Sequence, residues 1–531
     1  MDTPFLEVQL PFGYSSFAKL RKDKKIYVDK SHLLARIAQN GSSFFIARPR
    51  RFGKSLLVST FKSLFTHGLS DFAGLNIEKM WTDHTYRVLH LDFSICANFD
   101  TIDGFQQSFT TIFDRALIEG GFDVPPPDRD AFRRFFAFLS AQPLGSLVLL
   151  IDEYDAPLTQ HLDNSELFKK VQDKLSSFYL FVKHCDANLR FLFITGITKF
   201  QNTGIFSAFN SLNDITLNPD YSTLLGYTKD EILENFGAHI NHAAQMLSCT
   251  PEHILEELKT YFDGYCFDEL VSAKVFNPWS VLSFFYQPKI GFQNHWYASG
   301  GKPNILLKYL AKHVISQEIL FKSGLSILRG ELYSSYNFDT MNPKALLVHT
   351  GYLTITKRLN PFTFQLDYPN KEVRQSLEML YADELLSQRT LSECGIGDVH
   401  ETLQHGEAAD VVDMLNLMLA SIDYKDYPIT NEASCRSHVQ FLLLGAAFLP
   451  HVESHNAFGR SDLEVTVGQR HWVFEFKFTR SAADLDQKLL EAEEQVKTRK
   501  YGLAHSKHIC LRVALVFSAK DRQFTRWSLV P

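Results

Sequence analysis

The chain has 531 residues, more than a single hydrophobic core normally serves, so we expect two to four domains. It is 45% hydrophobic and 21% charged with a net charge of −6, which is typical of a soluble globular protein and argues against a generally basic nucleic-acid coat. The seven cysteines are scattered with no CxxC pair, which argues against zinc ribbons and disulfide frameworks and fits a reducing compartment.

The first part of the chain alternates short apolar runs with longer amphipathic stretches. The expected strands cover 43–47, 87–94, 146–155 and 190–198, and the expected helices cover 54–65, 105–120 and 165–183. Strands that alternate with helices predict a parallel sheet covered on both faces. The continuous apolar character of these runs fits strands that are buried on both sides.

The rest of the chain shows two further patterns. From about residue 226 to residue 390 the periodicity is mostly helical, and strand patterns return briefly at 346–356 and 362–370. A second α/β pattern begins at about residue 431. Its expected elements are a helix over 432–446, strands over 447–454, 461–467 and 471–478, a helix over 482–500 and a strand over 508–517.

The sequence contains no membrane or export signal. The opening segment "MDTPFLEVQLPFGYSSF" lacks a basic region followed by an apolar one, so no signal peptide is expected. The longest apolar stretch, "VQFLLLGAAFLP" (439–450), is too short to span a bilayer. We therefore expect a cytoplasmic protein without a membrane partner.

Residues 48–55, "RPRRFGKS", lie between the first expected strand and its helix. A phosphate-binding loop presents backbone N–H groups at a helix N-terminus, where the helix dipole also favours anions. Gly53 would allow close approach of phosphates, Lys54 would contact the β- and γ-phosphates, and Ser55 would ligate Mg²⁺. Arg48, however, stands where such loops normally have their first glycine.

The third expected strand supplies the carboxylates that a nucleotide site also needs. Within "LVLLIDEYD", Asp152 is positioned to hold Mg²⁺ and Glu153 to polarise an attacking water. The fourth expected strand ends in Thr198 and Lys199, which would sense the γ-phosphate. These elements, in this order, favour a nucleotide site.

Each part of this constellation also has a plainer interpretation. Gly-Lys-Ser alone commonly starts a helix after a turn, and Asp152-Glu153 alone is typical of a solvated strand end. Arg50 and Arg51 stay open between surface charge and contact with phosphate or a partner.

A second constellation lies in "GRSDLEVTVGQRHWVFEFKF" (459–478). Glu475 and Lys477 are two residues apart on an expected strand, so both point to the same face. With Asp462 they suit phosphodiester hydrolysis: the two carboxylates would bind one or two Mg²⁺ ions, and Lys477 would orient the hydroxide. Glu432, at the start of the preceding helix, would complete or support the metal site.

The following helix and the charge of this region add to the second constellation. Gln495 and Tyr501 lie on or beyond that helix, where they would face the same cleft. From residue 431 onward there are 14 Lys and Arg against 11 Asp and Glu, so this end carries +3 and the rest −9, which permits nucleic-acid binding. A Glu-x-Lys pair is also typical of an exposed cross-strand salt bridge whose interleaved phenylalanines form the buried face.

Further short strings accompany the two constellations. In chain order they are "LPFGYSSFAKL" (10–20), "YVDKS" (27–31), "LLIDEYDAPL" (149–158), "ITGITKF" (194–200), "IFSAFNSLND" (205–214), "YFDGYCF" (261–267), "FNPWSVL" (276–282), "TGYLTI" (350–355) and "YPNKEV" (368–373). Together with "RPRRFGKS" and "GRSDLEV…FEFKF", they resemble a widespread group of microbial proteins. Members of that group join an N-terminal AAA-ATPase-like domain to a C-terminal PD-(D/E)XK nuclease-superfamily domain, and the resemblance covers nearly the whole chain.

The resemblance implies an α/β fold in three parts: a P-loop NTPase parallel-sheet domain over 1–225, a mostly helical coupling region over 226–400 and a restriction-endonuclease-like domain over 401–531. In this family an arginine is usual at the position of Arg48. The resemblance implies ATP and Mg²⁺ as cofactors and nucleic acid, with DNA favoured, as the substrate. It is also compatible with an oligomer.

The resulting hypothesis is an ATP-binding, ATP-hydrolysing protein whose Mg²⁺-dependent nuclease domain cleaves nucleic acid under nucleotide control. One alternative is a nucleotide-dependent switch or scaffold that binds nucleic acid or protein without cleavage, and another is a protein that binds ATP without turning it over.

Overall fold

The computed structural model describes residues 9–40, 43–200, 212–298, 304–310, 324–333, 341–386, 393, 396–425, 427–446, 448, 450–452, 455–456, 459–499 and 508–531. The chain divides into two compact units. The first comprises Met1–Tyr309 and Ser323–Arg374, and the second comprises Leu310–Lys322 and Gln375–Pro531. The division at residues 225 and 400 remains a prediction.

The first unit contains the expected parallel sheet, with strand order β2-β3-β4-β1-β5. Its strands are β1 (Ser43–Ala47), β2 (Arg87–Asp92), β3 (Leu147–Asp152), β4 (Leu189–Gly196) and β5 (Leu212–Asp214). Every residue of β1 and β3 is buried, as their continuous apolar sequences predict. Because all strands are parallel, their carboxyl ends, where the candidate nucleotide residues stand, meet at one edge of the sheet.

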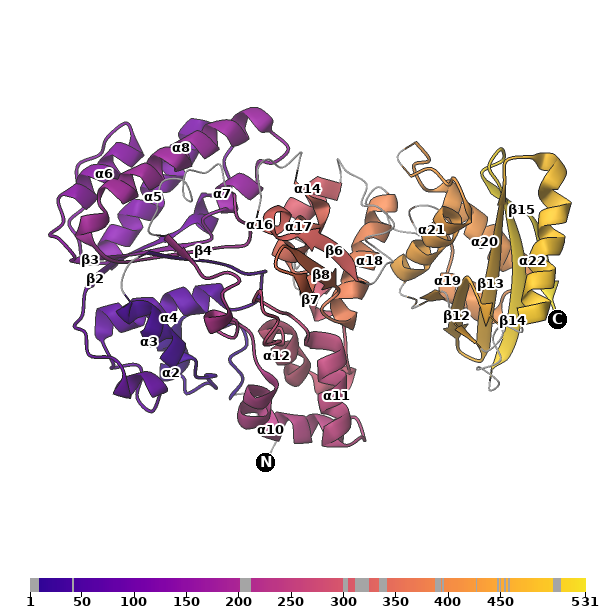
Figure 1. Cartoon of the computed structure of the whole chain (residues 1–531), viewed down its shortest axis with the longest axis horizontal. Coiled ribbons are helices and arrows are strands. Elements are labelled where there is room, and N and C mark those ends of the chain that lie inside the picture. Colours follow the sequence, from indigo (N-terminus) through magenta and orange to yellow (C-terminus); the bar gives the residue numbers. More distant parts are fainter. Residues whose placement is uncertain are drawn as a thin grey trace. The chain divides into compact units, whose positions relative to one another are not determined.

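Helices cover both faces of this sheet: α2, α3 and α4 lie on one side and α5, α6 and α8 on the other (Figure 1). The helices of this part are α2 (Phe17–Lys22), α3 (Ser31–Gln39), α4 (Lys54–His67), α5 (Ile102–Glu119), α6 (Ala131–Ser140), α7 (Ala156–Thr159) and α8 (Ser165–His184). Side-chain caps from Thr101, Asp130 and Asn164 fix the starts of α5, α6 and α8.

A helical region follows the sheet within the first unit. Its helices are α10 (Lys229–Met246), α11 (Pro251–Phe262), α12 (Pro278–Tyr286), α13 (His295–Ala298), α14 (Asn304–Leu310), α16 (Arg329–Tyr333), α17 (Pro343–Thr350) and α18 (Lys371–Leu385), the last crossing into the second unit. Leu10 and Val28 from the N-terminal segment share one core with α10, α11 and α12. This core joins the segment that contains Leu10 and Val28 to the helical region.

A small antiparallel sheet lies in the same region, with order β6-β8-β7, made of β6 (Leu325–Leu328), β7 (Thr354–Asn360) and β8 (Thr363–Asp367). The strand pattern expected over 346–356 is therefore wrong in its first half, because Pro343–Thr350 form α17. Asn342 caps this helix and Gly351 ends it with φ +86. A buried helix segment and a buried strand have the same apolar composition, so periodicity alone does not separate them over this length.

The second unit contains a mixed five-stranded sheet of order β15-β14-β13-β12-β9, in which only the β13–β14 pair is parallel. Its strands are β9 (His451–Val452), β12 (Leu463–Val467), β13 (Arg470–Thr479), β14 (Ile509–Ser518) and β15 (Gln523–Val530), with a separate short pair β10 (His455–Asn456) and β11 (Gly459–Arg460). The strand expected over 447–454 is reduced to β9, and part of that range lies outside the described residues. β15 was not anticipated from the sequence.

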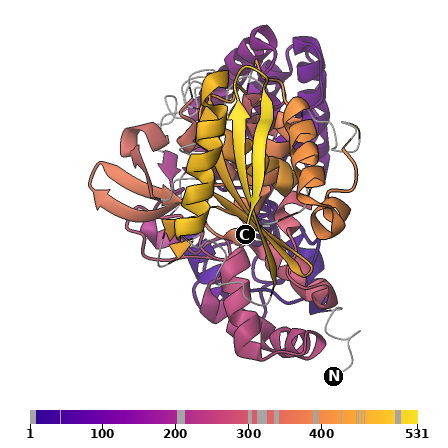
Figure 2. The ribbon, with the colours of Figure 1, turned by 90° about the vertical axis from the view of Figure 1, so that its right-hand side faces the viewer.

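Helices lie on both sides of this sheet, with α22 on one side and the preceding helices on the other (Figures 1 and 2). They are α19 (Val399–His405), α20 (Ala408–Ala420), α21 (Glu432–Gly445) and α22 (Leu485–Arg499). Val473 packs with Ala492 and Val496 of α22, whereas the indole of Trp472 donates to the Leu403 carbonyl of α19. Among the described residues, no helix combines the length and apolar character needed to cross a membrane.

Candidate functional site

The loop between β1 and α4 has the backbone that a phosphate site requires. Gly53 is the N-cap of α4 and has φ +88, in the left-handed region that glycine tolerates without strain. A Cβ built on Gly53 would meet only Leu225, at 4.0 Å, so the space above the loop is open. The first turn of α4 thus leaves its N–H groups accessible to an anion.

Lys54 and Ser55 begin α4 with different exposures. The Lys54 side chain is buried, and its Nζ donates to the carbonyls of Arg48 and Pro49 at 3.0 and 3.1 Å. Burial lowers the pKa of Lys54, which the carboxylates of Glu153 and Asp152 partly offset. Ser55 is exposed at the helix N-terminus.

A cavity of about 460 Å³ opens above this loop, a size that suits a nucleotide. Its walls combine the N-terminal segment 11–34, the loop 50–57, the turn 224–227 and α12. Arg50, Gly53, Lys54, Ser55 and Glu153 all line it. Five of the short strings noted in the sequence therefore surround one space, although the first and the last of them lie more than 200 residues apart in the chain.

The end of β3 places Glu153 in this cavity and Asp152 beside it. Glu153 has φ +49, a left-handed conformation that is costly for a residue with a side chain and is found most often at functional positions. Burial raises the pKa of Glu153, and the Lys54 ammonium opposes that rise. Asp152 is buried, and its Oδ1 accepts a hydrogen bond from Thr195 Oγ1.

Thr198 is held by a residue that the sequence analysis did not single out. Asp155 is buried, and its carboxylate accepts hydrogen bonds from Thr198 N, Thr198 Oγ1 and Ile197 N at 2.8 to 3.1 Å. Thr198 is itself buried and is absent from the lining of the large cavity. Its proposed role as a γ-phosphate sensor therefore remains a prediction, and Asp155 fixes the loop after β4. The sequence signal that could have identified Asp155 is its place as the third acidic residue of "IDEYD".

The arginines of "RPRRFGKS" separate into different environments. The Arg51 guanidinium lies 4.3 Å from the ring of Trp279 in α12, so this arginine joins the phosphate loop to the helical region. Arg50 lines the cavity. Contact with nucleotide remains a prediction for both Arg50 and Arg51.

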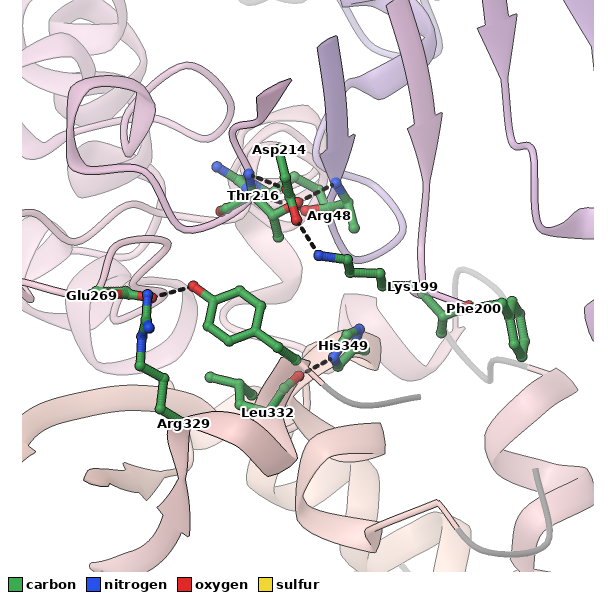
Figure 3. Close-up of polar contacts among 12 residues, drawn as sticks. Arg48, Lys199, Phe200, Asp214, Thr216, Glu269, Arg329, Leu332 and His349 are labelled. Carbon is green, nitrogen blue, oxygen red and sulfur yellow. Dashed lines mark hydrogen bonds and ion pairs between the residues drawn. The ribbon is translucent and has the colours of Figure 1, made fainter. Parts of the chain in front are cut away.

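Arg48 is buried at the end of β1 and does not face the large cavity. Its Nη1 donates to the carbonyls of Ala47 and Thr216, and its guanidinium stacks 4.2 Å from the Phe267 ring. Burial lowers the pKa of Arg48 to about 9, with Asp214 acting in the opposite direction. Figure 3 shows Arg48 beside the Lys199–Asp214 ion pair, which spans 2.6 Å. Arg48 thus supports the loop from behind.

The C-terminal constellation gathers on β12, β13 and α21. Lys477 Nζ lies 3.1 Å from Glu475 Oε1 and 3.7 Å from Glu432 Oε2. Asp462 Oδ2 accepts a hydrogen bond from the Phe476 backbone N–H at 2.9 Å, which places its carboxylate beside the Glu475–Lys477 segment. The four residues proposed from the sequence therefore come together.

Glu475 is fully buried, so the exposed cross-strand salt bridge considered for Glu-x-Lys is wrong. Both faces of β13 are covered because α22 packs against the face that the alternating pattern left open. Burial, and then the nearby Asp462 carboxylate, raise the pKa of Glu475 to about 7.

Further groups surround this site. Arg436 lies one turn after Glu432 on α21, 3.8 Å from Asp462 Oδ1. The sequence analysis missed it, because whether Arg436 reaches the site depends on which face of the helix meets the strand. Arg499 of α22 favours the ionised form of Glu475. Gln495 is half-buried on the same helix, and Tyr501 lies outside the described residues.

The residues of the second site fit a divalent cation that needs few protein ligands. Glu475 Oε2 is buried and has no hydrogen-bond partner among the described residues, so it is available as a ligand. Mg²⁺ usually retains several waters and takes only one or two carboxylates from the protein. Within the described part of the chain, no group of three or more His, Cys, Asp or Glu side chains has the spacing of a metal cage. A Mg²⁺ ion held by Asp462 and Glu475 would therefore take its remaining ligands from water.

Comparison with known families agrees with both halves of this arrangement. Residues 11–206 match the AAA-ATPase-like family, described as "Predicted AAA-ATPase", and residues 430–527 match the PD-(D/E)XK nuclease superfamily. The chain therefore joins an AAA-ATPase-like domain to a PD-(D/E)XK nuclease-superfamily domain, and the expected fusion and fold class are confirmed.

The matches to individual proteins include the following two. One is a protein of Azotobacter chroococcum mcd 1 described as "Uncharacterized protein in vnfD 5'region", 27% identical over 485 residues, which are 88% of this chain and 89% of the relative. The other is the crystal structure of Cdc6p from Pyrobaculum aerophilum, with 12% identity and a TM-score of 0.26, covering 68% of this chain and 97% of that chain.

Proposed function

We propose that the protein binds and hydrolyses ATP in its first unit, and that its second unit cleaves phosphodiester bonds of nucleic acid, with DNA favoured, under the control of the bound nucleotide. The observation that carries the proposal is the convergence of Asp462, Glu475 and Lys477, with an unpaired buried oxygen on Glu475. The AAA-ATPase-like and PD-(D/E)XK domains support nucleotide binding and nuclease chemistry in general.

In the nucleotide site, Lys54 would exchange its two carbonyl partners for β- and γ-phosphate oxygens. Ser55 and Asp152 would hold Mg²⁺, and Glu153, whose raised pKa favours proton uptake, would accept a proton from the attacking water. Arg51, stacked on Trp279, would transmit a displacement of the phosphate loop to α12.

In the nuclease site, Asp462 and Glu475 would hold Mg²⁺, supported by Glu432. Bound Mg²⁺ supplies an activated water and stabilises charge on the phosphate in this class of reaction. Lys477 Nζ, fixed by Glu475, would orient that water, and Gln495 would face the same cleft. Asp462 is itself positioned by the Phe476 N–H.

The test is cleavage of labelled nucleic acid by the full chain with Mg²⁺, with and without ATP. We expect Lys477→Ala to reduce cleavage by about 10²-fold or more, the loss found when one charge-stabilising group is removed. Lys54→Ala is expected to retain basal cleavage and lose the response to ATP. Intact substrate in every nucleotide state would contradict the nuclease, and an unchanged ATP response in Lys54→Ala would contradict the control.

The alternative is a nucleotide-dependent switch or scaffold that binds nucleic acid or protein without cutting. The buried carboxyl of Glu475 favours the enzyme, because its pKa is raised beside Asp462 and Lys477 and perturbed pKa values cluster at functional sites. Mn²⁺ titration of the full chain, with Asp462→Ala as control, distinguishes the two. Binding that disappears in Asp462→Ala supports the enzyme, whereas the alternative predicts no binding at this site.

A further inference from the structure

The end of the first unit has the topology of a winged-helix domain. Its described elements run in chain order α14, β6, α16, α17, β7, β8, and its antiparallel sheet places β8 between β6 and β7. Contacts within the described residues join the elements: Lys344 of α17 donates to the Ser326 carbonyl of β6, and His349 of α17 contacts the Leu332 carbonyl of α16. In this arrangement α17 has the place of the recognition helix and the β7–β8 hairpin is the wing.

The helix α17 is not available to a large ligand in this structure. None of its residues is exposed, and Val348 and His349 line a small cavity of about 40 Å³ together with Arg48 and Lys199. A Cβ on Gly351, which ends the helix, would lie 2.8 Å from Pro49 in the phosphate loop. Figure 3 shows His349, which contacts the Leu332 carbonyl, on the side of Lys199 and Asp214, and these residues line the same small cavity, so α17 lies beside the carboxyl edge of the sheet of the ATPase-like domain.

The hairpin, by contrast, is exposed from residue 357 to residue 362. Asn360 Oδ1 accepts the Phe362 N–H at 2.9 Å, and the Phe362 carbonyl accepts the Arg329 N–H at 2.8 Å, so the turn has a fixed shape. Apolar side chains nevertheless face solvent here, with Phe362 73% and Leu328 54% exposed. An ordered, apolar and exposed tip of this kind marks an interaction surface.

The charge beside this tip indicates the chemistry of its partner. Lys357 and Arg358 are both exposed on β7, and no ion pair with another described residue engages either of them. The nearby Arg329 is paired with Glu269, and Glu331 is used by the Leu328 N–H. Glu331 keeps its negative charge when it accepts this N–H, so the two cations Lys357 and Arg358 leave a net positive charge next to the apolar tip. Cations beside an apolar wedge suit duplex DNA, where the cations neutralise phosphates and the wedge enters the minor groove.

We propose that the β7–β8 hairpin is a DNA-binding wing, separate from the nuclease-like domain, in which Lys357 and Arg358 contact phosphates and Phe362 enters the minor groove. Because the same module packs against Pro49 and Arg48 through α17 and Gly351, the wing is joined directly to the back of the phosphate loop. The proposal needs no cleavage and goes beyond the function proposed above.

The test measures binding of the full chain to a fluorescein-labelled DNA duplex by anisotropy, in EDTA so that no cleavage occurs. For Lys357→Glu with Arg358→Glu we expect at least about tenfold weaker binding and a slope of log affinity against log salt that is lower by about 2, since each phosphate contact contributes about 0.9. Phe362→Ala is expected to weaken binding several-fold and leave the slope unchanged, because it removes no charge.

The matched control is Lys229→Glu with Lys289→Glu, which changes the charge equally at two exposed lysines outside the module. We expect its affinity and slope to equal those of the wild type. Unchanged DNA binding in the wing variants would overturn the proposal and leave the hairpin as a contact for protein. Equal losses in wing and control variants would also overturn it, since they indicate only net charge. Thermal unfolding of each variant establishes that it is folded.

Discussion

At the scale of single residues, the main finding is that the chemistry of Glu475 differs from that of an ordinary surface carboxylate. The pKa of Glu475 is raised to about 7 in the folded protein, whereas the unfolded value is about 4.5. Between these two pH values the folded protein binds a proton at Glu475 that the unfolded chain has released. This contribution to stability is complete below the unfolded pKa and is lost as the pH rises through about 7. The Asp462 carboxylate contributes to the shift because its negative charge disfavours ionisation of Glu475.

The same shift predicts pH-dependent metal binding, because a carboxylate ligand must be deprotonated. We expect Mn²⁺ affinity at the second site to rise about tenfold between about pH 6 and about pH 8, as a group of pKa near 7 ionises, and to level off above that range. Isothermal titration calorimetry at several pH values measures this. Glu475→Gln serves as control and is expected to bind weakly at every pH, whereas equal wild-type affinities at both pH values would contradict the assignment.

Other residue environments could not be obtained from the sequence, for physical reasons. The residues of "GKS" and "FEFKF" were found because their spacing carries chemistry. The burial of Arg48 against Phe267 depends on a partner more than 200 positions away, and the hydrogen bonds from Thr198 to Asp155 depend on strand order. Periodicity reports local faces and contains no information on such pairs.

At the scale of elements, strands and helices with strong periodicity were predicted closely, since β1 and α21 begin where the sequence indicates. The errors arose where tertiary packing decides. α17 is a helix in an apolar segment too short for its period to be evident, and β13 is buried on both faces because α22 covers it. Packing also explains the strings "YFDGYCF" and "YPNKEV", because Gly264 of the first lies against Pro369 of the second.

This contact yields a stability prediction. Gly264 has φ +101, and a Cβ on it would lie 2.0 Å from the Pro369 carbonyl oxygen. Gly264→Ala is therefore expected to lower the free energy of unfolding by about 2–4 kcal/mol, from left-handed strain and overpacking together. Urea unfolding followed by tryptophan fluorescence measures the change. Gly330→Ala, whose Cβ would meet nothing within 4 Å, is the control and is expected to be neutral or slightly stabilising. Equal behaviour of the two variants would refute this explanation.

At the scale of the whole molecule, the two compact units carry different constellations. The cavity above the phosphate loop is built entirely from the first unit, and Asp462, Glu475 and Lys477 belong to the second. The sequence predicted the two chemistries and their order. It did not predict the winged-helix topology, because that topology is defined by the pairing of β6 with β8, which no local pattern encodes.

Ligands are therefore expected to stabilise the units separately. In differential scanning calorimetry of the full chain, a non-hydrolysable ATP analogue at about 100 times its Kd adds about 2.7 kcal/mol to the unit that binds it. We expect one transition to move upward while the other stays in place, and Lys54→Ala to abolish the movement. If both transitions moved together, or neither did, the assignment of the nucleotide to the first unit alone would be contradicted.

The hydrogen bonds of Lys54 to Arg48 and Pro49 have a kinetic consequence. The ammonium joins the two ends of the phosphate loop and so stabilises its shape. An arriving phosphate then exchanges partners with a group already in place and does not have to order a mobile segment, which removes one of the usual entropic costs of association. If the first unit binds nucleotide as proposed, we expect capture to be limited by encounter with the cavity, and differences in affinity among nucleotides to be expressed in their dissociation rates.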